Sequence, residues 1–77
     1  MQGKFKAFMY WYIMDKYGST QYIYVISVSE KQANYFWFRY LHNVLGNVFD
    51  YCIDPCNEIE CKYIHSVGDV LGQNALI

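Results

Sequence analysis

Two short runs of aromatic and β-branched residues dominate the first third of the chain. The first run is FMYWYIM, residues 8–14, and the second is QYIYVI, residues 21–26, with the segment DKYGST at 15–20 between them. Aromatic and β-branched residues favour strands, whereas Asp, Gly, Ser and Thr favour turns. The sequence therefore predicts a β-hairpin, with strands over 4–14 and 21–28.

Alternation along the two predicted strands divides their side chains between two faces, because successive strand residues point to opposite sides. Ile23 and Val25 suit a core, whereas a tyrosine can bury its ring and keep its hydroxyl in water. We expect one face of the hairpin to be open and aromatic, with lysines at one end. Its residues would be Lys4, Lys6, Phe8, Tyr10, Tyr12, Tyr22 and Tyr24.

A helix is predicted from Ser29 to about Leu45. Ser29 and Gln32 have the spacing of a capping box, and Gly46 stands where a left-handed C-cap is favoured. The apolar arc of this helix is wider than the roughly 100° that packing on one sheet requires, so either the C-terminal tail or a partner must cover the excess. The packing stripe of this arc consists of Ala33, Trp37, Tyr40, Leu41 and Val44, and it is flanked by Phe36, Phe38 and Leu45. The side opposite the apolar arc includes Tyr35, Arg39 and His42.

The segment after the helix predicts a second hairpin. Residues 48–53 alternate in a way that is typical of a strand, and DPCN at 54–57 is typical of a turn. Residues 58–64 then alternate charged with apolar side chains. The alternative is a helix opened by Asp54 and Pro55, with acidic residues near its positive end. Residues 66–77 are interrupted by glycine and form either a short docked segment or a frayed end.

Together these elements predict a single α+β domain over residues 1–77. The order is β-β-α-β-β, with one helix across one face of a four-stranded antiparallel sheet. Its 77 residues are 55% hydrophobic and 21% aromatic but only 17% charged, which is rich for a chain that must stay soluble alone. We therefore expect some rings to lie at an interface, and a homo-oligomer, with a dimer as the first expectation.

The charge and hydropathy of the chain disfavour two classes of partner. The tyrosine-rich sheet face could stack the bases of a single-stranded nucleic acid, so a small nucleic-acid-binding module is an alternative function. A net charge of −1 lacks the basic footprint of a protein that grips a phosphate backbone, so nucleic acid is disfavoured. No apolar run approaches the roughly 20 residues that span a bilayer, so we expect a protein that does not enter the membrane. Three cysteines without an export signal indicate a reduced, cytoplasmic protein.

The cysteines indicate one alternative role for this part of the chain, which is to form a zinc site. Its four ligands would be Cys52, Cys56, Cys61 and His65. On a strand, Cys61 and His65 would lie about 13 Å apart, too far for one tetrahedral ion, whereas on a helix they would be neighbours. The favoured interpretation has no metal: Cys52 and Cys61 would be small buried hydrophobic residues, and Cys56 would lie on a turn.

No motif in the chain predicts an enzyme or a cofactor. The sequence contains no nucleophile elbow, glycine-rich phosphate loop or metal triad. Tyrosine and tryptophan are instead the residues that dominate protein-interface hot spots. We expect a protein-binding module that acts stoichiometrically, as an inhibitor or adaptor, and its size and plan resemble those of small phage and mobile-element proteins. Its expected anchors are Tyr10, Tyr12, Tyr22 and Tyr24, with Tyr35, Arg39 and His42 as a second patch.

Overall fold

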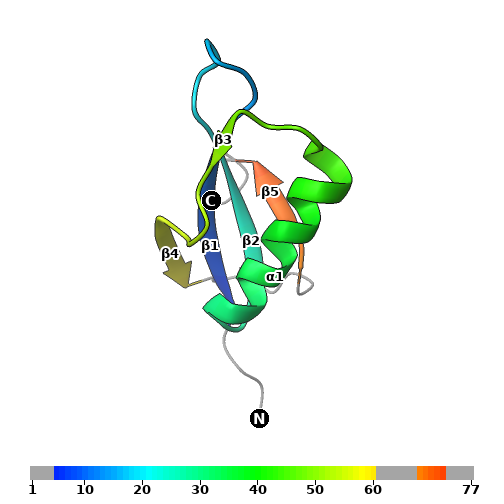
Figure 1. The fold of residues 1–77 in the computed structure, drawn as a ribbon. Helices are drawn as coiled ribbons and strands as arrows, with labels where there is room; N and C mark the ends of the chain where they lie inside the picture. The colour runs from blue at the N-terminus through cyan, green and yellow to red at the C-terminus, as the bar shows by residue number, and fades with distance from the viewer. Residues whose placement is uncertain (1–4, 61–67, 73–77) are drawn as a thin grey trace.

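The computed structural model describes residues 5–60 and 68–72 as an antiparallel sheet with one helix packed across a face (Figure 1). The elements are β1 (Lys6–Ile13), β2 (Gln21–Ser27), α1 (Glu30–Tyr40), the π-helical turn η1 (Leu41–Leu45), β3 (Asp50–Tyr51), β4 (Asn57–Glu60) and β5 (Val70–Gly72). The strand order is β3-β1-β2-β5, with β4 also paired to β1. The predicted α+β class is confirmed, with five strands where four were expected.

β1 and β2 form the hairpin that the aromatic runs predict, in antiparallel pairing along most of their length. In the connection between them, the Asp15 carboxylate accepts a hydrogen bond from the backbone N–H of Tyr17 at 3.0 Å. The N–H of Gly18 donates to the Asp15 carbonyl, also at 3.0 Å. These are short-range bonds of the kind that Asp and Gly make in turns, so local sequence accounts for the hairpin.

The register of the hairpin contradicts the prediction of a single aromatic face. Tyr10 lies opposite Ile23, and Met9 lies opposite Tyr24. Directly opposed residues of an antiparallel pair share a face. Tyr10 and Tyr12 therefore lie on the same face as Ile23, toward α1. Tyr22 and Tyr24 lie on the other face.

The core is centred on Trp37 of α1, whose side chain is completely buried. Its ring stacks on that of Tyr10, with centroids 4.8 Å apart, and its indole N–H donates to the Cys52 carbonyl at 2.8 Å. The buried members of this cluster are Phe8, Tyr10, Ile23, Val25, Ala33, Trp37 and Leu41. A smaller buried cluster on the opposite face of the sheet consists of Ala7, Tyr24 and Ile26.

The predicted helix is confirmed at both of its ends. The Ser29 hydroxyl accepts a hydrogen bond from the N–H of Gln32 at 3.2 Å. The Gln32 side-chain oxygen in turn accepts one from the hydroxyl of Ser27 at 2.7 Å. The helix ends in η1, where the N–H of Gly46 donates to the Leu41 carbonyl at 2.8 Å, a bond between residues five apart. Gly46 has a φ of 73°, the left-handed region that favours glycine.

The second hairpin is a wrong prediction, and so is its helical alternative over residues 57–60. β3 and β4 do not pair with each other; both pair antiparallel with β1. They form one edge strand that is interrupted by an arch at 52–56, where Cys52 and Cys56 donate backbone N–H bonds to carbonyls of β1 at 3.1 and 2.8 Å. By pairing with β1, both short strands satisfy their backbone groups along the same edge of the sheet.

The C-terminal segment contributes the fifth strand, because Val70–Gly72 pairs antiparallel with β2. This agrees with the docked alternative for residues 70–72, and residues 66–67 and 73–77 lie outside the described part of the chain. Within residues 5–60 and 68–72, no helix has the length and apolar character needed to cross a membrane.

Candidate functional site

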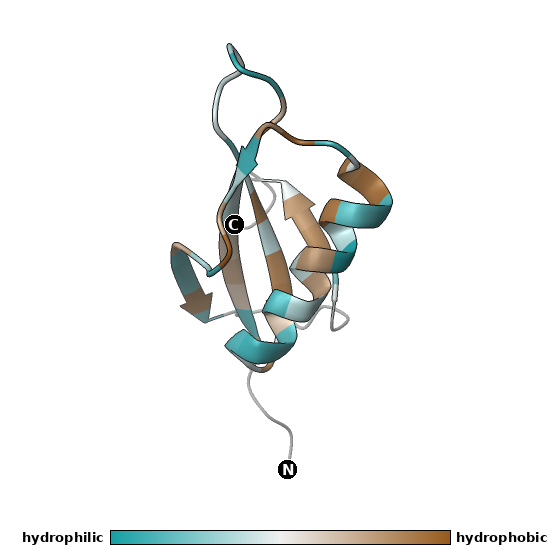
Figure 2. Cartoon of the chain, in the orientation of Figure 1, coloured by the Kyte–Doolittle hydropathy of each residue, from teal (hydrophilic) through white to brown (hydrophobic). Residues whose placement is uncertain are grey.

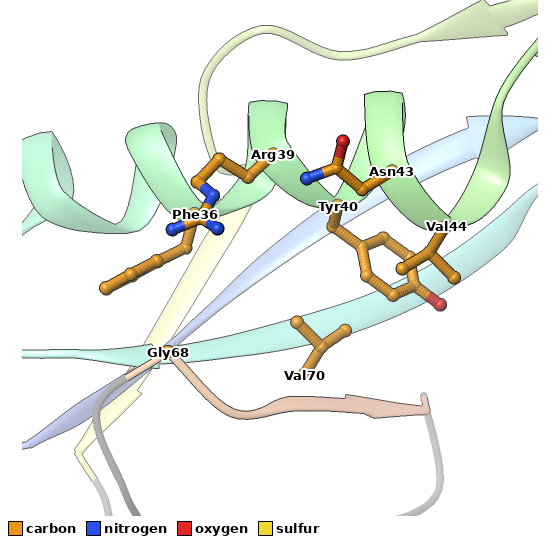
Figure 3. Close-up of a pocket in the computed structure, with 7 residues that line it drawn as sticks. All are labelled: Phe36, Arg39, Tyr40, Asn43, Val44, Gly68 and Val70. Carbon is orange, nitrogen blue, oxygen red and sulfur yellow. The ribbon is translucent and has the colours of Figure 1, made fainter.

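A concave surface of the described chain lies between the helix and the edge strand β5 (Figure 3). We call it the helix–strand groove. It has a volume of about 290 Å³ and is open to solvent. Its lining residues are Phe36, Arg39, Tyr40, Asn43, Val44, Gly68 and Val70.

Helical periodicity brings five of these side chains together. Phe36, Tyr40 and Val44 are spaced four residues apart, and Arg39 and Asn43 repeat the same spacing one position earlier, so all five share one side of the helix. The first three supply an apolar surface, and the other two supply a guanidinium and an amide. Val44 is 65% exposed although the sequence places it on the predicted packing stripe. It belongs to η1, where the bond between residues five apart changes the order in which side chains pass around the helix.

The strand side of the groove depends on a glycine. Gly68 has a φ of 90°, and a Cβ added there would lie 3.3 Å from the ring of Phe36. A side chain at this position would therefore be strained in its backbone and would displace the ring that lines the groove. Val70 follows two residues later and directs its side chain toward Tyr40 and the helix (Figure 3).

The rim of the groove carries the Arg39 guanidinium, which forms no ion pair with a carboxylate of residues 5–60 and 68–72. The Arg39 guanidinium lies over the ring of Tyr35, 5.7 Å from its centroid, and Tyr35 in turn contacts the ring of Phe36 at 5.6 Å. Among residues 5–60 and 68–72, the ion pair that forms is between Lys6 and Glu58, and it does not involve Arg39. The guanidinium thus lies over an aromatic ring at the rim and is not engaged by a described carboxylate.

The second predicted patch is brought together only in part. Tyr35 and Arg39 are in contact, and both are exposed. His42 is also exposed, on η1, but it does not line the groove. The patch is better described as the Tyr35–Arg39 rim of the helix–strand groove than as a separate surface.

The four tyrosines of the first predicted patch are dispersed. Tyr10 is completely buried, and its hydroxyl donates to the Asn34 side chain at 2.6 Å. Burial raises the pKa of that hydroxyl well above its ordinary value. Tyr12 is half-buried, with its ring 6.2 Å from that of Trp37, and Tyr24 is 9% exposed on the opposite face of the sheet. Tyr22, which is half-buried, shares that opposite face.

The described cysteines are packed against β1. Cys52 Sγ accepts a hydrogen bond from the backbone N–H of Trp11 at 3.2 Å, and Cys56 Sγ donates to the Met9 carbonyl at 3.3 Å. Burial raises the pKa of both thiols, which keeps them protonated near neutral pH. A cysteine that acts as a nucleophile has a lowered thiol pKa instead.

The zinc alternative extends outside the described residues, where Cys61 and His65 lie. In the part of the chain that the structure describes, no group of three His, Cys, Asp or Glu side chains could hold a metal ion. The four-ligand site therefore stays a prediction.

Sequence reasoning missed most of the groove. The width of the apolar arc of the helix was the available signal, because Phe36 flanks the predicted packing stripe, but it did not say what would lie opposite Phe36. Gly68 and Val70 belong to a segment whose sequence left its structure open. The groove exists only because β5 joins the sheet beside β2, a pairing that local sequence does not determine.

Comparisons of the chain with protein-family models, with curated proteins and with solved structures find no match. What this protein does must therefore be inferred from the geometry and chemistry of its own surface.

Proposed function

We propose that this chain is a small non-enzymatic protein-binding module, which acts stoichiometrically by occupying a surface of another protein through the helix–strand groove and its rim. The observation that supports this is the exposure of interface-type side chains around an open groove. Tyr35 is 58% exposed and Val44 is 65% exposed, although the core beneath them is filled by Trp37. Single exposed apolar residues are ordinary, but here they border a concave surface.

The rim has the features of an interface hot spot. Tyr and Arg are enriched among residues that dominate binding energy, and rigid side chains lose less entropy when they bind. Tyr35 is held between Arg39 and Phe36 by ring contacts of 5.7 and 5.6 Å. This arrangement orders both rim side chains before a partner arrives.

A stoichiometric role is favoured over catalysis by the chemistry of the groove. Its polar lining groups are the Arg39 guanidinium, the Asn43 amide and the Tyr40 hydroxyl, with no carboxylate, histidine or thiol among the described lining residues. General acid–base catalysis needs a group that can exchange a proton near neutral pH, in reach of the reacting atoms. We place the protein in the cytoplasm as an inhibitor or adaptor, in the style of small phage and mobile-element proteins.

Self-association is a second proposal, and a different surface supports it. Alternate residues of the segment around β3 are exposed and apolar, with Phe49 at 59%, Tyr51 at 41% and Ile53 at 62%. Figure 2 shows hydrophobic colour on the chain that leads from the helix into β3. This β3-side patch lies across the sheet from β5, so a homodimer formed through it would leave the helix–strand groove free.

Affinity capture from cells that naturally make the protein tests the binding function. We expect the wild-type chain to retain one protein in about a one-to-one ratio, and the Val44→Glu variant to lose it. Lys16→Glu is the matched control, because Lys16 is exposed on the β1–β2 connection, and it should retain the partner. A partner retained equally by all three chains would refute the role of the groove, and the lack of any stoichiometric partner would refute the function.

A further inference from the structure

The edge strand β5 is hydrogen-bonded on one side only, as far as the described residues show. It pairs with β2, and no other described strand pairs with it. The N–H of Ile26 donates to the Asp69 carbonyl at 2.8 Å, so this carbonyl points toward β2. Because backbone direction alternates along an antiparallel strand, Leu71 also faces β2, whereas Val70 and Gly72 direct their N–H and C=O groups outward.

The β5 strand forms one side of the helix–strand groove through Val70. Val70 is opposite Val25, which belongs to the core on the α1 side, so the Val70 side chain points into the groove. Figure 3 shows β5 along one side of the groove and the helix along the other. A residue of an added strand that paired with Val70 would share its face and place its side chain between β5 and the helix.

The opposite edge of the sheet is built differently. Its strand is interrupted by the arch at 52–56, and β4 carries Glu58, which pairs with Lys6 at 3.3 Å, and Glu60. Interruption and charge are devices that protect an edge from pairing with another chain. β5, with the sequence VLG, carries no charge and is coloured hydrophobic along most of its length in Figure 2.

We propose that the helix–strand groove binds an extended peptide segment of the partner, which adds to the sheet as a strand on β5. One apolar side chain of the peptide enters the groove opposite Val70, against Phe36 and Val44. A carboxylate of the same peptide pairs with the Arg39 guanidinium at the rim. The backbone supplies affinity through the outward groups of Val70 and Gly72, and the groove supplies specificity.

Charge complementarity selects this class of peptide. Arg39 has no described carboxylate partner, and its planar guanidinium matches a carboxylate in two parallel hydrogen bonds. This inference rests on the proposed function, because it names the chemistry and the mode of binding of the partner.

A selection from a displayed library of random linear peptides tests the proposal. We expect the wild-type chain to enrich peptides in which an apolar residue lies within two positions of Asp or Glu. Arg39→Gln should weaken an enriched peptide about tenfold. The same peptide with its carboxylate changed to an amide should bind the wild-type and Arg39→Gln chains about equally.

Two variants of Gly72 test the proposed backbone hydrogen bond between β5 and the peptide. Gly72→Pro removes an outward N–H and should weaken the peptide about fivefold, whereas Gly72→Ala keeps the N–H, meets no atom within 4 Å and should bind as the wild type does. If Gly72→Pro does not fold, a synthetic chain with an ester in place of the Leu71–Gly72 amide removes the same donor.

The proposal would be overturned by the absence of any enriched peptide, by enriched peptides without an acidic residue, or by equal affinity for Gly72→Pro and Gly72→Ala. A wild-type oligomer that Gly72→Pro dissociates would also overturn it, since a second copy would then occupy the edge. If a full-length partner is lost on Val44→Glu but is unaffected by the Gly72 variants, the proposed function stands and this inference fails.

Discussion

Asn34→Ala is expected to destabilise the fold by about 1–3 kcal/mol, because it leaves the buried Tyr10 hydroxyl without an acceptor. Tyr10 is 0% exposed, and its hydroxyl donates to the Asn34 side chain at 2.6 Å. Asn34 continues the network by donating to the Asp54 carboxylate at 3.4 Å. The two bonds connect β1, α1 and the arch at 52–56, three segments that local sequence does not bring together.

The partner variant separates the hydrogen bond from other effects. Tyr10→Phe keeps the ring that stacks on Trp37 at 4.8 Å, and it leaves an Asn34 side chain that is half-buried and reaches water. Its expected cost is about 0.5–1.5 kcal/mol. In the double variant neither group lacks a partner, so its cost should fall short of the sum of the two single costs by about 1 kcal/mol.

Urea unfolding followed by far-ultraviolet circular dichroism measures these differences in the free energy of unfolding. Asn43→Ala is the matched control: Asn43 is exposed on η1, and its replacement should change stability by no more than about 0.5 kcal/mol. The reasoning would be refuted if Asn34→Ala were as mild as this control, or if the two single changes were additive within about 0.3 kcal/mol.

Two further predictions concern stability. Burial raises the pKa of Tyr10 above its ordinary value of 10.0, so above that pH the unfolded chain loses a proton that the folded chain keeps. The contribution of Tyr10 to the free energy of unfolding is fully present below pH 10 and is lost as the pH rises, by up to about 1.4 kcal/mol per pH unit. Urea titrations at increasing pH should therefore show a steeper loss for the wild type than for Tyr10→Phe. Gly68→Ala should cost about 1–3 kcal/mol in thermal or urea unfolding, because its φ is 90° and the new Cβ would lie 3.3 Å from Phe36, whereas Gly72→Ala should cost much less. Equal costs for the two glycines would contradict the account of the strand side of the groove.

Local sequence alone determined the hairpin and the capped helix of this protein. The turn at 15–20 uses bonds between Asp15 and residues two or three positions away, and Ser29 caps a helix that ends before Gly46. Such features depend on neighbours in the chain, so a residue pattern is sufficient to predict them. The excess apolar arc of the helix likewise indicated that something must lie beside it.

Only the tertiary structure decided which face each tyrosine occupies and what lies beside the helix. Alternation divides a strand into two sets of side chains, but a shift of one residue in register exchanges the faces, and the long connection at 14–20 does not specify that register. Tyr10 is in the core because it lies opposite Ile23 and under Trp37. The pairing of β3 and β4 with β1, and of β5 with β2, satisfies backbone groups far apart in sequence, and it is this pairing that creates the helix–strand groove.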